Sequence, residues 1–149
     1  MAIMAKERHK LIPTVYLILI KNNRILLLRR YNTGFMDGYY SFPAGHVEPN
    51  ETLTQAMVRE AKEEIGIDIN KEDLRLIHVM HRKEPNEERI NFFFTTEKYE
   101  GAPKIMEPHK CDDLNWFDLN NLPDNVIPYI KQVIENILQR KIYSEYGWK

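Results

Sequence analysis

The sequence is poor in cysteine, in glycine and in net charge. Its 149 residues include one cysteine, Cys111, and six glycines, and the formal net charge is −1. A single cysteine cannot form an internal disulfide, which fits a reducing compartment, so we expect a cytoplasmic protein in which Cys111 is an ordinary small residue. A net charge this close to zero gives no basic field, so we expect no binding to long nucleic acid.

Long apolar runs are also missing. The run from Thr14 to Ile20 has the length of a buried strand, well short of a membrane span. The first ten residues contain no apolar segment of the kind found in secretory signals. We therefore expect no membrane partner. Without repeats or linkers, the length suits a single domain covering residues 1–149.

The remaining patterns alternate between strand and helix. Runs rich in β-branched and aromatic residues predict strands at 14–20, 25–30, 74–82, 89–98 and 114–117, with the first two forming a hairpin. The run at 39–47 is broken by Pro43 and predicts a short strand that passes into a loop before the next helix. The strand at 89–98 is apolar on both faces and is expected to be central. A helix is predicted from Val126 to about Tyr143, with five residues on its apolar face: Ile127, Ile130, Ile134, Ile137 and Leu138. His78 is expected to be a hydrogen-bonded core residue.

A further helix is predicted between Thr52 and Ile65. Apolar residues recur there at three- and four-residue spacing and form one stripe. Gly66 suits the position just after the end of this helix. Three residues are candidates to cap its start: Asn50, Glu51 and Thr52.

Three glutamates on this helix share one flank. Glu60, Glu63 and Glu64 stand three and four residues apart, and such like-charged pairs cost about 0.2–0.5 kcal/mol each. They also lie near the C-terminal end of the helix, where the macrodipole disfavours anions. Their hard oxygen atoms suit Mg²⁺, with Mn²⁺ as a possible substitute. A solvated acidic helix face is the alternative.

The polar residues of this stretch also have a fixed spacing. Gly45 is followed after five residues by Glu51, after seven more by Arg59-Glu60-Ala61, and then by Glu63-Glu64 and Gly66-Ile67. This pattern over residues 45–67 resembles the signature of the Nudix hydrolases at every position. The resemblance implies an α/β fold, the α/β/α sandwich with a mixed β-sheet between helices. It also implies an Mg²⁺-dependent enzyme that hydrolyses a phosphoanhydride bond in a nucleoside diphosphate-linked compound.

The resemblance implies a metal site as well. Glu60, Glu63 and Glu64 would ligate the metal, together with the backbone carbonyl of Ala44. A further carboxylate is expected from a late loop, where Glu107 is the candidate. Asp112 and Asp113 compete with it for that role.

Catalytic and supporting roles follow from the same resemblance. Glu60 would help to deprotonate the attacking water, with Glu63 or Glu107 as the alternative base. Arg59 would pair with Glu51 or Glu63 and hold the carboxylates in register. Three residues are expected to have structural roles: Gly45, Glu51 and Gly66.

Substrate contacts are indicated less directly. Arg29 and Arg30 leave a strand and could pair with phosphates, or form a solvated strand end. Arg82, near a hairpin turn with His81 and Arg89, is a further candidate, with surface decoration as the alternative. Five aromatic residues could stack on a base or belong to the core: Tyr31, Phe35, Tyr39, Tyr40 and Phe42.

The choice of substrate rests on resemblance to the small MutT-type members. Asn32-Thr33-Gly34, Asp37-Gly38 and the downstream Glu107-Pro108 and Trp116-Phe117 pairs carry that resemblance. It favours a nucleoside triphosphate pyrophosphohydrolase that releases a nucleoside monophosphate and pyrophosphate. A nucleotide sugar or another nucleoside diphosphate-linked compound is the alternative.

Two further possibilities remain open. A non-catalytic Nudix-like sensor or interaction domain is the alternative from another class, although such a domain would need none of the three acids. The expected partner is a small nucleotide. The arm at residues 1–11 and the tail at 143–149 could form a homodimer contact or pack back on the chain.

Overall fold

The computed structural model describes residues 5–149 and has a mixed α/β architecture. Within this range no helix is both long and apolar enough to cross a membrane. The helices are α1 (Leu53–Ile65), η1 (Lys71–Asp73) and α2 (Pro128–Leu138). The strands are β1 (Ile12–Ile18), β2 (Ile20–Lys21), β3 (Arg24–Arg30), β4 (Tyr40–Ser41), β5 (Ala44–His46), β6 (Arg75–Glu84), β7 (Glu87–Thr95), β8 (Cys111–Asp118) and β9 (Tyr143–Tyr146).

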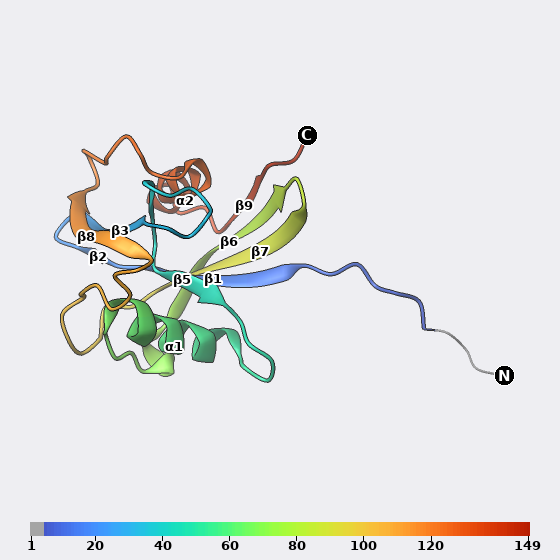
Figure 1. Ribbon diagram of the computed structural model, residues 1–149, viewed down its shortest axis with the longest axis horizontal. Coiled ribbons are helices and arrows are strands. Elements are labelled where there is room, and N and C mark those ends of the chain that lie inside the picture. The colour runs from blue at the N-terminus through green and yellow to red at the C-terminus, as the bar shows by residue number, and fades with distance from the viewer. Residues whose placement is uncertain (1–4) are drawn as a thin grey trace.

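The strands form two sheets. The larger is mixed, in the order β5-β1-β7-β6-β9, with β1 parallel to β7 and β6 parallel to β9. The smaller is antiparallel and is built around β3, which pairs with β2, β4 and β8. Figure 1 shows α1 on one side of the larger sheet and α2 on the other, which confirms the predicted sandwich.

Each face of the larger sheet carries its own core, because successive side chains on a strand point to opposite faces. On β1, Tyr16 and Ile18 belong to the core under α2, whereas Val15 and Leu17 belong to the core under α1. This alternation fixes which strand residues can reach the α2 side, and that side also borders the site described below.

The helix α1 has the ends that the sequence predicts. Thr52 is the N-cap and forms a reciprocal capping box with Gln55, in which each side chain bonds the other residue's backbone N–H. Gly66 ends the helix with φ of 71°, in the left-handed region that glycine adopts without strain. Both ends of the helix are therefore fixed locally.

The strand predictions need two corrections. The hairpin partner of β3 is the short β2, because β1 ends at Ile18 and pairs with β5 and β7. The strands β6 and β7 extend through the polar stretch to Glu84 and Glu87, so the turn between them is only two residues long. The predicted central place of β7 is confirmed, since it lies between β1 and β6.

The predicted second helix is too long at its C-terminal end. It stops at Leu138, which is 55% exposed and is not part of the buried face. Arg140 has φ of 58° and reverses the chain, and residues 143–146 then form β9 along β6. Pairing with β6 outweighs the local helical pattern.

The C-terminal tail packs back on the chain. His78 is buried on β6 and hydrogen-bonds the backbone oxygen of Lys141 and the hydroxyl of Ser144, as expected of a satisfied core histidine. The indole N–H of Trp148 donates to the backbone oxygen of His81 at 3.0 Å. Of the N-terminal arm, residues 1–4 lie outside the described residues, and residues 5–10 are exposed and form no strand or helix.

Replacing Gly147 with alanine should weaken the attachment of this tail. Gly147 has φ of +85°, and an added Cβ would collide with the backbone oxygen of Lys83. We expect a loss of roughly 1–3 kcal/mol in the free energy of unfolding, measured by urea denaturation with Trp148 fluorescence. The matched control is Gly38→Ala, which has the same φ but open space around it. Equal losses in the two variants would contradict the predicted collision.

Candidate active site

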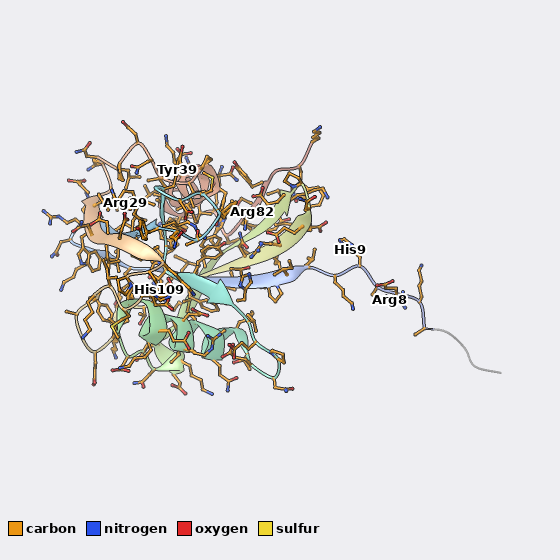
Figure 2. The ribbon with its side chains drawn as sticks, viewed as in Figure 1. Arg8, His9, Arg29, Tyr39, Arg82 and His109 are labelled. Carbon is orange, nitrogen blue, oxygen red and sulfur yellow. The ribbon has the colours of Figure 1, made fainter. Side chains whose placement is uncertain are left out.

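A cavity of about 810 Å³ opens where the larger sheet, α1 and two loops meet. Its centre is formed by Ala44 and Gly45 of β5 and by Glu60 and Glu64 of α1. One end borders α2 and the ends of β1, β6 and β7. The other end borders the loop after β3 and the segment before β8, where Figure 2 labels His109.

Arg59 holds the acidic residues of α1 together. Its guanidinium makes a two-point contact with Glu51, at 2.7 and 3.0 Å, and donates to Glu60 at 2.8 Å and Glu63 at 3.3 Å. It also donates to the backbone oxygen of His46 at 3.0 Å, which ties α1 to β5. The bond from Arg59 lowers the pKa of Glu51 to about 2. Arg59 thus pairs with both of its predicted partners at once.

Gly45 leaves room for the Glu60 side chain. A Cβ at Gly45 would overlap the carboxyl group of Glu60, so these two residues pack directly against each other. The backbone of Gly45 is not left-handed, and its lack of a side chain is therefore a matter of space. The glycine at the start of the 45–67 pattern and the glutamate 15 residues later form one local unit.

Glu64 is half-buried and lines the cavity. Its carboxylate accepts the backbone N–H of Ala44 at 3.1 Å. Desolvation of its carboxylate, followed by the negative charges of Glu60 and Glu107, raises the pKa of Glu64 to about 8. The pKa of Glu60 is also raised, mainly by burial, against the lowering effect of Arg59. The charge of these carboxylates is thus only partly compensated by the protein.

The cavity fits a divalent cation, although the described residues do not form a finished metal site. Glu60, Glu64 and Glu107 all line it, and their oxygens are the ligand type that Mg²⁺ and Mn²⁺ prefer. Within residues 5–149 no three His, Cys, Asp or Glu side chains are gathered closely enough to hold a metal ion.

Two of the predicted metal ligands, Glu63 and Ala44, do not present a carboxylate to the cavity as Glu60 and Glu64 do. The side chain of Glu63 is 52% exposed, contacts Arg59, and lines a separate groove on the far side of α1. Ala44 belongs to β5 and presents its N–H to Glu64, where the sequence predicts a loop residue.

The predicted arginines do not all face the cavity. Arg30 and Arg82 line it, whereas Arg29 pairs with Asp112 at 2.7 Å and is not among the lining residues. Asp113 accepts a hydrogen bond from Tyr40. Of the three late acids, Glu107 is therefore the one that the structure brings to Glu60 and Glu64.

Several lining residues are missed by the sequence analysis as site residues. Thr14 and Tyr16 lie on β1, Tyr129 lies on α2, and His109 and Lys110 follow Glu107. Arg89 was considered only as a possible contact, yet it lies opposite Arg82 across β6 and β7. The period-2 alternation along 89–95 is the signal that could have placed Arg89 on the α2 side.

The aromatic residues divide between core and cavity. Tyr40 and Phe42 are buried in the core under α2. Phe35 lines the cavity, and the Arg30 guanidinium lies 5.5 Å from the centre of its ring. Tyr31 and Tyr39 are exposed and are not among the lining residues. Phe35 is therefore the one member of the predicted set that can meet a ligand directly.

Metal-free protein should lose stability as the pH rises from 7 to 8.5. The pKa of Glu64 is about 8 in the folded chain but near 4.5 when unfolded, so the folded state binds the extra proton. Stability therefore falls as pH passes through the folded pKa, above the range where histidines titrate. Urea unfolding with chelator at several pH values measures this slope. Glu64→Gln should flatten it, and an unchanged slope in that variant would contradict the assignment.

Comparison with known proteins agrees with this geometry. The model of the NUDIX domain family matches residues 10–137. An ADP-ribose pyrophosphatase of Methanocaldococcus jannaschii is 35% identical over 122 residues, which are 80% of this chain and 70% of that protein. A NAD-capped RNA hydrolase NudC of Stutzerimonas stutzeri is 31% identical over 114 residues, 76% of this chain but only 39% of that longer protein.

A solved structure shows the same fold. The MutT NUDIX hydrolase from Burkholderia pseudomallei superposes with a TM-score of 0.79 at 24% sequence identity, covering 87% of this chain and 99% of that one. The family model covers every helix except the last residue of α2 and every strand except β9. Gly45, Glu60 and Glu64 of the 45–67 pattern line the cavity. On these grounds the chain belongs to the NUDIX domain family.

Proposed function

We propose that the protein hydrolyses a phosphoanhydride bond in a nucleoside diphosphate-linked compound, with a divalent metal as cofactor. The observation that carries this proposal is the half-buried acidic group of Glu60, Glu64 and Glu107, whose charge is only partly compensated, inside a cavity with polar groups at both ends. A substrate with a diphosphate in its middle and a group on either side matches that layout.

The residues of the chain then have distinct tasks. Glu60, Glu64 and Glu107 would hold the cation, with the Ala44 peptide beside them. A bound divalent ion would neutralise phosphate charge and acidify a water molecule. Glu60 lines the cavity and burial raises its pKa, which makes it a better proton acceptor than an ordinary carboxylate. Arg59 would position Glu60, and Arg30 would contact a phosphate.

The names of the relatives support a substrate with two organic groups. Two of them are called an ADP-ribose pyrophosphatase and a NAD-capped RNA hydrolase. The chain spans about two fifths of the length of the latter, so RNA recognition is not transferred from it.

A nucleoside triphosphate is the second candidate. It is the compound favoured by the MutT-type resemblance, and it would yield a monophosphate and pyrophosphate. Arg30 favours it specifically, because its guanidinium lines the cavity and, among residues 5–149, donates only to the neutral oxygens of Thr33 and Phe35. That positive charge is available to a further phosphate.

The intact acids favour an enzyme over a ligand sensor. A related NUDIX domain of NrtR from Shewanella oneidensis has been solved with ADP ribose, at a TM-score of 0.70. A domain that only binds its ligand has no need for three carboxylates around one point. Metal-dependent turnover separates these two functions.

A substrate panel tests the proposal. ADP-ribose, nucleotide sugars, dinucleotides and nucleoside triphosphates are incubated with Mg²⁺, and products are identified by chromatography. We expect hydrolysis of at least one class, release of a nucleoside monophosphate, and loss of turnover with chelator. Release of pyrophosphate from triphosphates alone would favour the second candidate. Metal-independent turnover, or binding without any hydrolysis, would contradict the proposal.

A further inference from the structure

One face of the larger sheet carries buried polar groups without partners. Asn91 on β7 is fully buried, and neither its amide nitrogen nor its amide oxygen has a hydrogen-bond partner among the described residues. Within the same part of the chain, the Nε atom of Arg82 is also unpartnered, and that residue is 3% exposed. Buried polar groups are nearly always satisfied in folded proteins, so these three atoms require an explanation.

Arg82 lines the end of the cavity that borders α2, and Asn91 is covered but is a neighbour of residues that line it. Side chains alternate along β7, so Asn91 points to the same face as Phe93, which packs under α2. Thr14 of β1 is directly beside Asn91 in the sheet, and Thr14 and Arg82 line the cavity. The unpartnered atoms therefore lie at, or just beneath, the cavity wall.

This wall is flat and aromatic. The Arg82 guanidinium lies 4.0 Å from the centre of the Tyr129 ring, and the Tyr129 hydroxyl contacts that of Tyr16 at 3.1 Å. Figure 2 labels Arg82 on β6, close to where β6 and β7 run side by side. Planar side chains beside unpartnered donors and an acceptor are suited to a planar ligand with polar edges.

The arginines at this end do not leave a net positive charge. Arg82 pairs with Glu84 at 2.6 Å, and Arg89 pairs with Glu87 at 2.6 Å. Arg89 also donates to His46 Nε2 at 2.8 Å, which requires that nitrogen to be an acceptor. A neutral ligand group is therefore favoured here, whereas Arg30 at the opposite end lacks a carboxylate partner within residues 5–149 and suits phosphate.

We propose that this end of the cavity, lined by Tyr16, Arg82 and Tyr129 with Asn91 covered behind them and here named the sheet-face subsite, binds the nucleobase of the substrate. The amide of Asn91 offers one donor group and one acceptor, and Arg82 Nε offers a further donor. A base edge presents the complementary set, as in amide and guanidinium contacts to bases elsewhere. The proposal rests on the proposed function, since it assigns one end of the same substrate.

Base binding at this subsite requires a small side-chain movement. Asn91 is covered in the free protein and does not itself line the cavity. Changes of rotamer at a binding site are common, and a shift of the neighbouring arginines would expose the amide. Arg82 is then the direct contact in the free cavity, and Asn91 becomes one when the base enters.

Binding of product-like ligands tests the subsite without any hydrolysis. Calorimetry with Mg²⁺ compares four nucleoside monophosphates (AMP, GMP, UMP and CMP) with ribose 5-phosphate, which lacks a base. In the wild-type protein we expect at least one nucleotide to bind about tenfold or more tightly than ribose 5-phosphate, as a good bidentate contact provides. Asn91→Leu and Arg82→Met should each bring the ratio of nucleotide affinity to ribose 5-phosphate affinity towards one.

The variants are chosen so that misfolding does not obscure the result. Asn91→Leu replaces an unpaired amide with an apolar group of similar size, so we expect no loss in melting temperature. The matched control is Asn136→Leu on α2, which removes another buried unpartnered amide nitrogen away from the cavity and should keep the wild-type ratio. Arg82→Met is scored only if its melting curve remains cooperative.

Three results would contradict the proposed subsite. The first is equal affinity of the wild-type protein for nucleotides and for ribose 5-phosphate. The second is an unchanged affinity ratio in folded Asn91→Leu, and the third is loss of that ratio in Phe35→Ala alone. The last result would place the base on the loop after β3. Absence of turnover in the substrate panel would count against the proposed function only, because the binding ratio does not depend on hydrolysis.

Discussion

Glu64→Gln should lower kcat by about 1,000-fold or more while leaving the metal-free fold at least as stable as wild type. The carboxylate of Glu64 is buried beside Glu60 and Glu107, and its pKa of about 8 shows that its charge is disfavoured in the folded chain. Glutamine keeps the shape and can still accept the Ala44 N–H through its amide oxygen. The variant thus removes a negative charge that only a bound cation would use.

Steady-state kinetics measure the expected loss in kcat, and thermal melting measures the stability of the metal-free fold. The Glu64→Gln protein should melt at or above the wild-type temperature in chelator and should lose the stabilisation that Mg²⁺ gives the wild type. The control is Glu135→Gln, an exposed glutamate on α2, which should retain full turnover. Near-wild-type activity of a correctly folded Glu64→Gln protein would refute the role of Glu64.

Gly45→Ala should reduce kcat by about 100-fold with little loss of stability. Its backbone conformation suits alanine, so the cost comes from overlap between the new methyl group and the Glu60 carboxyl. Because that carboxyl is the end of a flexible side chain, we expect it to move and to break its 2.8 Å bond with Arg59. The fold would survive, whereas the position of Glu60 would not.

A double-mutant cycle shows whether Gly45 acts through Glu60. If it does, the protein carrying both Gly45→Ala and Glu60→Gln should be no slower than Glu60→Gln alone, because the group being displaced is already disabled. Additive losses would mean that Gly45 contributes in another way, for example through its pairing with β1. Full activity of the Gly45→Ala protein would contradict the packing argument itself.

The local features of the fold could be predicted from sequence, because they depend on neighbouring residues. The ends of α1 are determined by nearby residues, Thr52 and Gln55 at its start and Gly66 at its end. The apolar stripe determines which face of the helix is buried. The acids at i, i+3 and i+4 must share a flank of any helix. The 45–67 pattern therefore places Glu60 and Glu64 correctly before any tertiary contact is known.

Features that depend on distant pairing were not predictable in the same way. The helix predicted to run to about Tyr143 stops at Leu138, and residues 143–146 form β9 because β6 offers an edge to pair with. Arg82 and Arg89 meet at the cavity because β6 and β7 extend into a stretch that looks like a polar loop. Glu63 carries the same sequence signal as Glu60 and Glu64, and only the structure shows that its exposed side chain contacts Arg59 and lines a separate groove.

The order of the strands has a consequence for self-association. The outermost strands of the larger sheet are its two shortest, β5 with three residues and β9 with four, while the ten-residue β6 is enclosed between β7 and β9. Long exposed edges invite pairing with other chains, and short edges resist it. β9 therefore protects the protein against aggregation, because without residues 143–146 the ten-residue β6 would be a long open edge.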